Sequence, residues 1–99
     1  MTELDPVIHA QARLRVVATL AGIPSGDRIV FTRLQKLLGM TAGNLSTHLR
    51  KLEDAGYVAV EKAFEGRSPV TSIALTRKGR QAFETYTASL EALLKGAVE

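Results

Sequence analysis

Residues 41–83 read TAGNLSTHLRKLEDAGYVAVEKAFEGRSPVTSIALTRKGRQAF, and the patterns in this stretch decide the fold. Thr41 can cap the start of a helix with its hydroxyl oxygen, and Gly56 can end that helix in the left-handed conformation. Between them leucines recur at helical spacing, which buries one face of the helix. They are Leu45, Leu49 and Leu52. The stretch therefore begins with a helix over about residues 41–55.

The second half of the stretch predicts two strands and a long helix. Tyr57–Phe64 is strand-like, and Val70–Leu75 is rich in the β-branched residues that favour strands. The turn cluster Glu65–Pro69 joins them, which makes a hairpin with a loop of about five residues. Thr76 then caps a final helix over residues 77–96.

Three further elements are expected upstream of residue 41. Asp5-Pro6 opens a first helix, with Asp as the cap and Pro at the first helical position, and Gly22 ends it. Ile29–Phe31 is a short β-prone segment, and Thr32 caps a two-turn helix over Arg33–Leu38. The resulting order, α-β-α-α-β-β-α, predicts a mainly α fold with a small β-hairpin, in the α+β class.

Length and composition indicate one globular domain. The chain has 99 residues, which is typical of a single domain, so we expect one domain over residues 1–99. Hydrophobic residues make up 45% and charged residues 23%, which is a globular composition. No apolar run approaches the roughly 18–20 residues of a membrane span, and no signal peptide is evident. We therefore expect a soluble cytoplasmic protein with no membrane partner.

Residue types that metal, redox or covalent chemistry needs are scarce. The absence of cysteine excludes a disulfide scaffold, an iron–sulfur site and a thiol nucleophile. His9 and His48 are the only histidines, and each is expected at the surface or half-buried. No phosphate-binding loop, nucleophile elbow or metal-ligand spacing is present. We expect no enzymatic activity, no metal and no cofactor, and nothing in the sequence supports a small-molecule effector.

Charge is concentrated in the middle of the chain. The whole chain has a net charge of +3, but residues 28–80 carry ten Lys and Arg against four Asp and Glu, a net of +6. Residues 1–27 and 81–99 are slightly acidic, with nets of −1 and −2. A basic centre between acidic ends suits a polyanion such as nucleic acid, although a random surface distribution explains the charges alone equally well.

Two short helices joined at Gly39-Met40 form a candidate helix-turn-helix. Away from its leucines the second helix carries small, polar and basic residues, namely Gly43, Asn44, Ser46, Thr47, Arg50, Lys51 and Asp54. Such a surface fits a DNA major groove, where Asn can pair with adenine and Arg with guanine. The alternative is a solvated polar face, which most amphipathic helices have.

The hairpin that follows adds basic residues next to this helix. Arg67 stands beside Gly66 at the tip, and Lys62 lies on the first strand. A basic β-ribbon directly after a helix-turn-helix can reach the neighbouring minor groove or the phosphates. Taken alone, Arg67 is equally well explained as an exposed loop charge.

The motifs of this region also identify a family resemblance. From Thr41 to Phe83 they read T-x-x-x-L-S-x-H-L-x-x-L-E-x-x-G-Y-V and F-x-G-R-x-P-x-T-x-x-x-L-T-x-x-G-R-x-x-F. The chain strongly resembles winged helix-turn-helix transcriptional regulators of the MarR/ArsR type, especially a short subgroup about as long as these 99 residues. The resemblance extends over essentially the whole chain from Ile8 onward.

The resemblance implies roles for individual residues. Residues 41–55 would be the recognition helix, with DNA-facing positions at Thr41, Asn44, Ser46, Thr47, Arg50 and Lys51. Arg67 matches the wing-tip arginine, Lys62 belongs to the same wing, and His48 matches a histidine that packs beside the surface that contacts the DNA backbone. Two departures matter: the chain is too short for all the helices that build the MarR effector pocket, and it lacks the clustered ligands of ArsR metal sensors.

These observations predict a sequence-specific regulator of transcription that binds double-stranded DNA and acts as a repressor; repression comes from the family alone. The main alternative is a winged helix that serves as a protein-interaction module, because fold does not fix function. Its interface would usually expose aromatic or aliphatic residues and not a polar, basic helix. A third class is an architectural DNA-binding protein without a preferred site.

The final helix predicts a homodimer. Phe83, Tyr86, Leu90, Leu93 and Ala97 are spaced three, four, three and four residues apart, which is a heptad seam, and Leu94 widens it. Two heptads are too few for a coiled coil, so the first helix is expected to contribute Val7, Ile8 and Leu14 beyond the needs of the core. Such a dimer would present two recognition helices to a pseudo-palindromic operator. The alternative is that the first helix of the same chain covers the seam.

Overall fold

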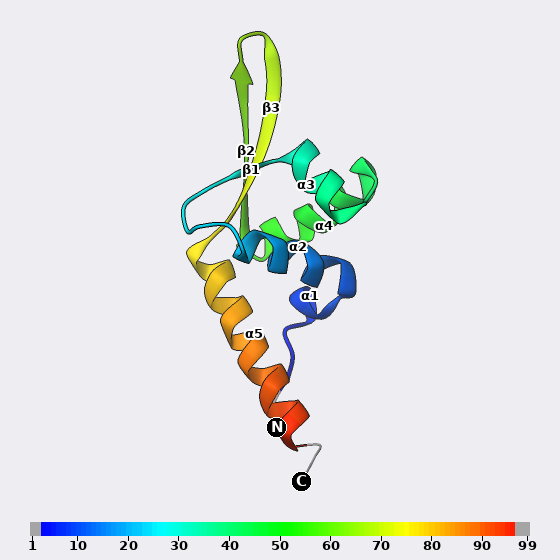
Figure 1. Ribbon diagram of the computed structural model, residues 1–99, viewed down its shortest axis with the longest axis vertical. Coiled ribbons are helices and arrows are strands. Elements are labelled where there is room, and N and C mark those ends of the chain that lie inside the picture. The colour runs from blue at the N-terminus through cyan, green and yellow to red at the C-terminus, as the bar shows by residue number, and fades with distance from the viewer. Residues whose placement is uncertain (1–2, 97–99) are drawn as a thin grey trace.

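The computed structural model describes residues 3–96 as a helical body with a protruding β-hairpin (Figure 1). The elements are α1 (Pro6–His9), α2 (Gln11–Ala21), β1 (Ile29–Val30), α3 (Phe31–Leu38), α4 (Ala42–Asp54), β2 (Val58–Glu65), β3 (Ser68–Leu75) and α5 (Arg77–Gly96). The molecule measures 59 × 25 × 21 Å, because the hairpin and the end of α5 extend from opposite sides of the body. The predicted fold class and element order are confirmed, apart from a division of the first helix.

The first predicted helix is in fact two helices, which corrects the single helix expected up to Gly22. Ala10 has extended dihedral angles, with φ −67° and ψ 128°, and separates α1 from α2. The Asp5 carboxylate accepts hydrogen bonds from the backbone of Val7 and Ile8, so the predicted cap is present. Arg13 donates through Nε to the carbonyl of Val7 at 2.6 Å, which satisfies the end of α1 with a side chain.

The three strands form an antiparallel sheet in the order β1-β3-β2. The short strand β1 pairs only with Ile73 and Ser72 of β3. Strands β2 and β3 pair along their whole length, from Val58 opposite Leu75 to Glu65 opposite Ser68. The base of the hairpin therefore belongs to a three-stranded sheet, and its outer half is a free two-stranded ribbon. Figure 1 shows this ribbon rising above the helices.

Two local predictions were wrong in detail. Thr32 does not cap α3, because the helix begins one residue earlier at Phe31, with Val30 in the cap position and no side-chain cap. The hairpin loop is also tighter than the five residues expected, since only Gly66 and Arg67 lie between the paired strand ends. Gly66 has φ 66° and Arg67 does not have positive φ, which is the pattern of a type II′ turn.

Helices α2, α3 and α4 pack on one side of the sheet and enclose a single core. Its fully or nearly fully buried members are Val16, Val17, Leu20, Ile29, Leu34, Leu38, Leu45, Leu49, Leu52, Val58 and Ile73. Burying a large aliphatic side chain contributes about 1.5–3 kcal/mol, so this cluster supplies most of the driving force for folding. The predicted leucine face of residues 41–55 is one wall of this core.

Helix α5 starts in close contact with the chain between α4 and β2. Thr76 caps it as predicted, because its Oγ1 accepts from the Gly79 backbone at 2.9 Å and donates to the Gly56 carbonyl at 2.6 Å. The Thr76 backbone N–H donates to the Tyr57 carbonyl at 3.0 Å. Gly79 is buried there, and a Cβ at this position would collide with the Tyr57 carbonyl. The glycine is what lets α5 approach this closely.

Candidate DNA-binding surface

Helix α4 presents its polar side to solvent in the way the sequence predicts. Thr41 Oγ1 accepts from the Asn44 backbone at 3.1 Å and caps the helix. Gly39, with φ 65°, makes the left-handed turn that separates α3 from α4. The leucines face the core, and the six predicted DNA-facing residues are all exposed: Thr41, Asn44, Ser46, Thr47, Arg50 and Lys51.

One of these side chains, that of Thr47, already makes a hydrogen bond within the helix. Thr47 Oγ1 donates to the carbonyl of Gly43 at 3.0 Å. Its hydroxyl proton is therefore used, and toward a ligand Thr47 offers an acceptor oxygen and a methyl group. In a major groove those groups suit an amino donor of adenine or cytosine, or the methyl group of thymine.

Strand alternation divides the wing, β2 and β3 with their turn, into two faces. Directly paired residues lie on the same face, so Lys62 and Thr71 share one face, and Glu61 and Ser72 share the other. The first face is the one toward α4, since Lys62 and Thr71 line a cleft of about 220 Å³ together with Ser46, Arg50 and Glu53. Arg67 is exposed at the tip, as the sequence predicts. The structure therefore brings Lys62 beside Arg50, which the linear spacing could not show.

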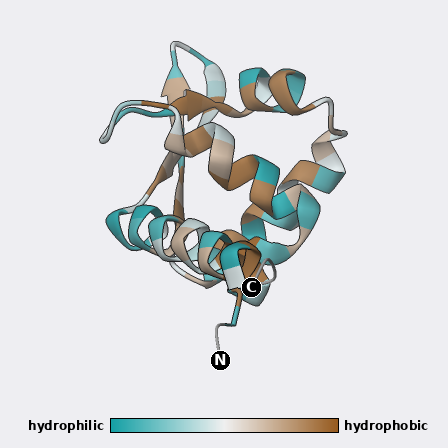
Figure 2. Ribbon diagram, turned by 60° about the horizontal axis from the view of Figure 1, so that its bottom comes forward, coloured by the Kyte–Doolittle hydropathy of each residue, from teal (hydrophilic) through white to brown (hydrophobic). Residues whose placement is uncertain are grey.

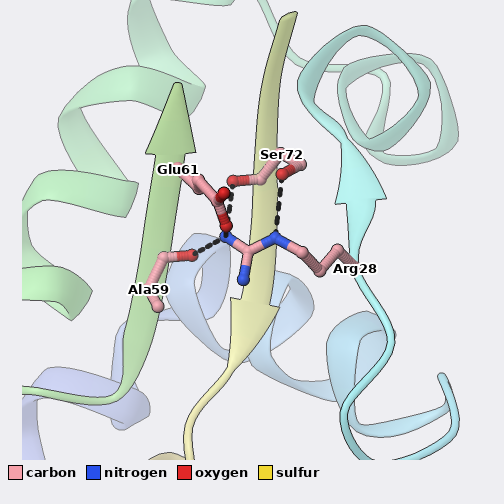
Figure 3. A network of polar contacts seen from close by, with 4 residues as sticks. All are labelled: Arg28, Ala59, Glu61 and Ser72. Carbon is pink, nitrogen blue, oxygen red and sulfur yellow. Dashed lines mark hydrogen bonds and ion pairs between the residues drawn. The ribbon is translucent and has the colours of Figure 1, made fainter. Parts of the chain in front are cut away.

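The opposite face of the wing is held by Arg28 (Figure 3). The guanidinium crosses β3, donating through Nε to Ser72 Oγ at 2.9 Å and through Nη2 to the carbonyls of Ala59 and Ser72. The same Nη2 lies 3.4 Å from a Glu61 carboxylate oxygen. Because this network reaches both strands, Arg28 fixes the base of the wing relative to the body. The sequence alone identifies Arg28 only as one charge of the basic centre.

Three other arginines are also used inside the fold. Arg15 donates to the Leu38 carbonyl at the end of α3, and Arg80 donates to the carbonyls of Ala21 and Ile23 at the end of α2. The third is Arg13, at the end of α1. Cations near helix C-termini are stabilising there, because the carbonyls carry partial negative charge. Two members of the basic centre, Arg28 and Arg80, are thus structural.

Six of the remaining eight cations of the basic centre lie on α3, α4 and the wing, and the other two lie in the first turn of α5. Within residues 3–96 all eight are exposed and have no ion pair or side-chain hydrogen bond: Arg33, Lys36, Arg50, Lys51, Lys62, Arg67, Arg77 and Lys78. Their charges are available to an anionic partner. The cations of α3, α4 and the wing make this half of the molecule basic, and Arg77 and Lys78 add positive charge at the start of α5.

The two histidines do not form a site. His48 is half-buried on α4, and its Nδ1 is buried without a hydrogen-bond partner among the described residues. His9 lies on α1 and contacts Tyr86 of α5, with Nδ1 2.9 Å from the phenol oxygen. Between residues 3 and 96 no group of three or more His, Asp or Glu is placed to hold a metal ion.

A polar junction ties the N-terminal segment to the start of the wing. The Tyr57 hydroxyl donates to the Asp5 carboxylate, and Lys78 Nζ lies 5.9 Å from the centroid of the Tyr57 ring. The hydrogen bond to Asp5, burial and the negative charge of Asp5 together raise the pKa of Tyr57 to about 12. Asp5 and Lys78 thus both contact Tyr57, the residue directly before β2.

The residues predicted to form the dimer interface differ in how far they are buried within this chain. Ile8 and Tyr86 are buried within this chain, with exposed fractions of 0% and 3%, so the expectation that Ile8 is available beyond the core is wrong. Val7, Leu14, Phe83 and Leu90 are partly buried. Leu93 and Leu94 are 48% and 60% exposed on the part of α5 that projects beyond the body, and Ala97 lies outside the described residues. Figure 2 shows α5 changing from hydrophilic first turns to hydrophobic positions near its C-terminal end.

Within residues 3–96, no helix combines the length and the apolarity that crossing a bilayer requires.

A known protein family matches most of the chain. The model of the family described as winged helix DNA-binding domain matches residues 12–94. The chain belongs to this family. The match covers α2 through nearly all of α5, so the family's architecture accounts for the helix-turn-helix, the wing and the final helix together.

Individual relatives agree with the family. The winged-helix chain is 35% identical over 80 residues to an uncharacterized protein of Methanocaldococcus jannaschii, covering 81% of this chain and 84% of that one. The structure of a transcriptional regulator homologue from Pyrococcus horikoshii superposes with a TM-score of 0.82 at 30% identity, covering 92% and 87% of the two chains. S. aureus MepR, solved in complex with DNA, has the same fold, with a TM-score of 0.68 at 18% identity, over 95% of this chain and 70% of MepR.

These findings confirm the predicted family. The chain is a winged-helix DNA-binding domain, and it has the fold of a MarR-family regulator from Enterococcus faecalis, with a TM-score of 0.73 at 22% identity. Its α3–α4 pair is the helix-turn-helix, with α4 in the recognition-helix position, and the β2–β3 hairpin is the wing.

Proposed function

We propose that this protein binds double-stranded DNA sequence-specifically and represses transcription by occluding a promoter. The observation that carries the proposal is that α4 and the wing present cations without ion pairs on one side, with Arg50 and Lys62 lining a shared cleft that also contains Glu53. In this proposal α4 enters the major groove, which is about 12 Å wide, and the wing follows the backbone to the next minor groove. MepR, which shares the fold, was solved bound to DNA, and this supports the same use here.

Within this proposal the residues of α4 have different tasks. Arg50 and Asn44 carry the side chains that can pair with two base-edge groups at once, guanine for Arg and adenine for Asn. Thr41, Ser46, Thr47 and Lys51 are assigned to flanking base or phosphate contacts. Lys62 and Arg67 contact phosphates or the minor groove from the wing. Positive charge on these side chains supports them as phosphate ligands, since phosphates dominate protein–DNA affinity.

The test starts from selection of bound sites out of a random duplex pool, which would give a motif and its symmetry. Arg50→Ala and Asn44→Ala are then titrated on the selected duplex and on a scrambled duplex, with Lys95→Ala as a control that removes one charge at the far end of α5. A base contact predicts a loss of discrimination worth about 1–3 kcal/mol for at least one of the two variants. Equal losses on both duplexes would show that neither residue reads bases.

We propose further that the functional unit is a homodimer formed through α5 and the N-terminal helices. Leu93 and Leu94 support this, because a large aliphatic side chain left in water forgoes about 1.5–3 kcal/mol relative to burial. Partly buried Val7, Leu14, Phe83 and Leu90 would border the same interface. A two-fold dimer would place its recognition helices on half-sites about one helical turn apart.

Sedimentation equilibrium tests the dimer. The wild type is expected to sediment as a dimer at micromolar concentrations, and Leu93→Glu/Leu94→Glu to give a folded monomer, because both side chains are already exposed in the single chain. A wild-type mass of 10.7 kDa that does not change with concentration would refute the dimer.

A protein-interaction module, the alternative function, predicts no salt-dependent binding to duplex DNA.

A further inference from the structure

Phe64 is the most exposed large hydrophobic side chain of the described residues. It lies on β2 one residue before the last of the strand, and 76% of its surface is accessible. An isolated exposed leucine or valine is ordinary, but a phenylalanine carries the largest apolar area that a side chain without a polar group can expose. Phe64 is thus a candidate for contact with something outside the chain.

Strand alternation places Phe64 on the face of the wing that looks toward α4. Val58, Val60, Lys62 and Phe64 are alternate residues of β2, and so share a face. Val58 is in the core and Lys62 lines the cleft shared with Arg50, which identifies that face. Phe64 continues the row by one further step, about 7 Å beyond Lys62.

The partner strand makes the same end of the row apolar. Phe64 is paired directly with Pro69, so the ring and the pyrrolidine lie on one face. The neighbouring pair on this face, Lys62 with Thr71, is polar and basic. From the body outward the α4-side face therefore changes from charged to apolar, and Arg67 follows at the turn.

Charge separates the two faces of the wing. The acidic residues Glu61 and Glu65 alternate onto the opposite face, and Glu61 is paired there with Arg28. No acidic residue of the wing shares the face of Phe64 and Lys62. Phosphates can therefore approach Phe64 without meeting a carboxylate on the wing, which argues for DNA as the occupant over a second protein surface.

Strand β1 does not reach this part of the hairpin. It pairs with Ser72 and Ile73, which leaves the Phe64–Pro69 pair on a two-stranded ribbon. Elements between residues 3 and 96 thus leave the ring uncovered, as its exposure shows. In the sequence Phe64 is only the expected end of a strand, and its alternation with Lys62 is the signal that places it on the face toward α4.

We propose that Phe64, backed by Pro69, packs against the deoxyribose wall of the minor groove beside the sequence read by α4. The walls of that groove are apolar sugar edges, and apolar side chains, Phe and Pro among them, are used by minor-groove binders. Phe64 supplies an uncharged contact between the phosphate contacts of Lys62 and Arg67. The inference rests on the proposed DNA binding and makes Phe64 a determinant of preference for groove width and deformability in the flanking DNA.

The test compares three variants on the selected duplex over a series of salt concentrations. Phe64→Ala is expected to weaken binding about 5–20-fold while the slope of log K against log salt stays unchanged, because no charge is lost. Phe64→Leu should retain most of the affinity. The matched control is the double variant Ala63→Phe/Phe64→Ala, which moves the ring to the opposite face and should bind as weakly as Phe64→Ala.

Each outcome decides between the possibilities. Wild-type affinity in Phe64→Ala, or restored affinity in the double variant, overturns the contact while DNA binding by the wild type stands. A reduced salt slope in Phe64→Ala overturns it as well, because the loss would then come from displaced cations. Reduced self-association of Phe64→Ala without DNA would assign the ring to a protein surface. A wild type that binds no duplex overturns the proposed function itself.

Discussion

Gly79 gives the sharpest test of how the fold is held together. A Cβ at this position would overlap the Tyr57 carbonyl oxygen and would lie 2.8 Å from its carbonyl carbon and 2.9 Å from Leu75 Cδ1. Two of these three atoms belong to the backbone, so no side-chain rotation can relieve the overlap. To relieve the overlap, the first turn of α5 has to move away from Tyr57, the residue directly before β2.

Two effects oppose each other in Gly79→Ala. Alanine is better than glycine in a helix by about 1 kcal/mol, which stabilises the folded state. Overpacking of a filled site costs about 1–3 kcal/mol, and the shift also weakens the hydrogen bond from Thr76 N–H to the Tyr57 carbonyl, worth about 1 kcal/mol. Because the obstacle is backbone, we expect overpacking to win, with a net destabilisation of about 1–3 kcal/mol.

Denaturation by urea and by heat measures the effect at one fixed protein concentration. For a domain of this size 1 kcal/mol lowers Tm by about 4–8 °C, so the variant should melt at least about 4 °C below the wild type. Gly43→Ala is the matched control, because Gly43 lies in α4 with nothing within 4 Å of its added Cβ. It should be neutral or slightly stabilising. Equal stability of Gly79→Ala and the wild type would refute the packing argument.

The remaining predictions concern charge and protonation. Arg67→Ala should leave Tm unchanged, since the side chain is exposed at the turn, and should reduce the salt slope of DNA binding by about one unit; a slope equal to that of wild type would contradict the phosphate contact. Arg28→Ala should lower the free energy of unfolding by about 1–2 kcal/mol and weaken DNA binding through the wing, whereas Lys95→Ala should do neither. The raised pKa of Tyr57, about 12, means that the folded state holds this proton more tightly than the unfolded state. Stability should therefore be fully present below pH 10 and fall as the pH rises from about 10 toward 12, and Tyr57→Phe should remove that part of the pH dependence in equilibrium unfolding.

Local signals predicted most of the fold. The cap at Thr41, the leucine row of α4 and the cap at Thr76 each act within one or two helical turns, so they can be read from adjacent residues. The errors arose where tertiary contacts dominate. The break at Ala10 is stabilised by Arg13 and by the Asp5–Tyr57 hydrogen bond, and the start of α3 at Phe31 has no side-chain cap to mark it.

The candidate site was predictable to a similar degree. The exposed residues of α4 and the arginine at the turn follow from helical and strand periodicity, which is local. The hydrogen bond from Arg28 to Ser72 could not be predicted from the sequence, because Ser72 lies on β3, 44 residues further along the chain. The buried position of Ile8 and Tyr86 likewise depends on how α1 and α5 meet, which no heptad pattern specifies.

The strand order has a consequence for how the chain folds. The surface assigned to DNA comes from one continuous stretch, α3 to β3, in which neighbours in space are near neighbours in sequence. Closing β1 onto β3 joins Ile29 to Ile73, and the N-terminal helices join α5 across a still longer loop. Loop-closure entropy makes such distant pairings slow steps, so the middle of the chain is expected to nucleate and both ends to complete it. Substitutions in the terminal helices should then act mainly on unfolding rates, and those in the core of α4 on folding rates.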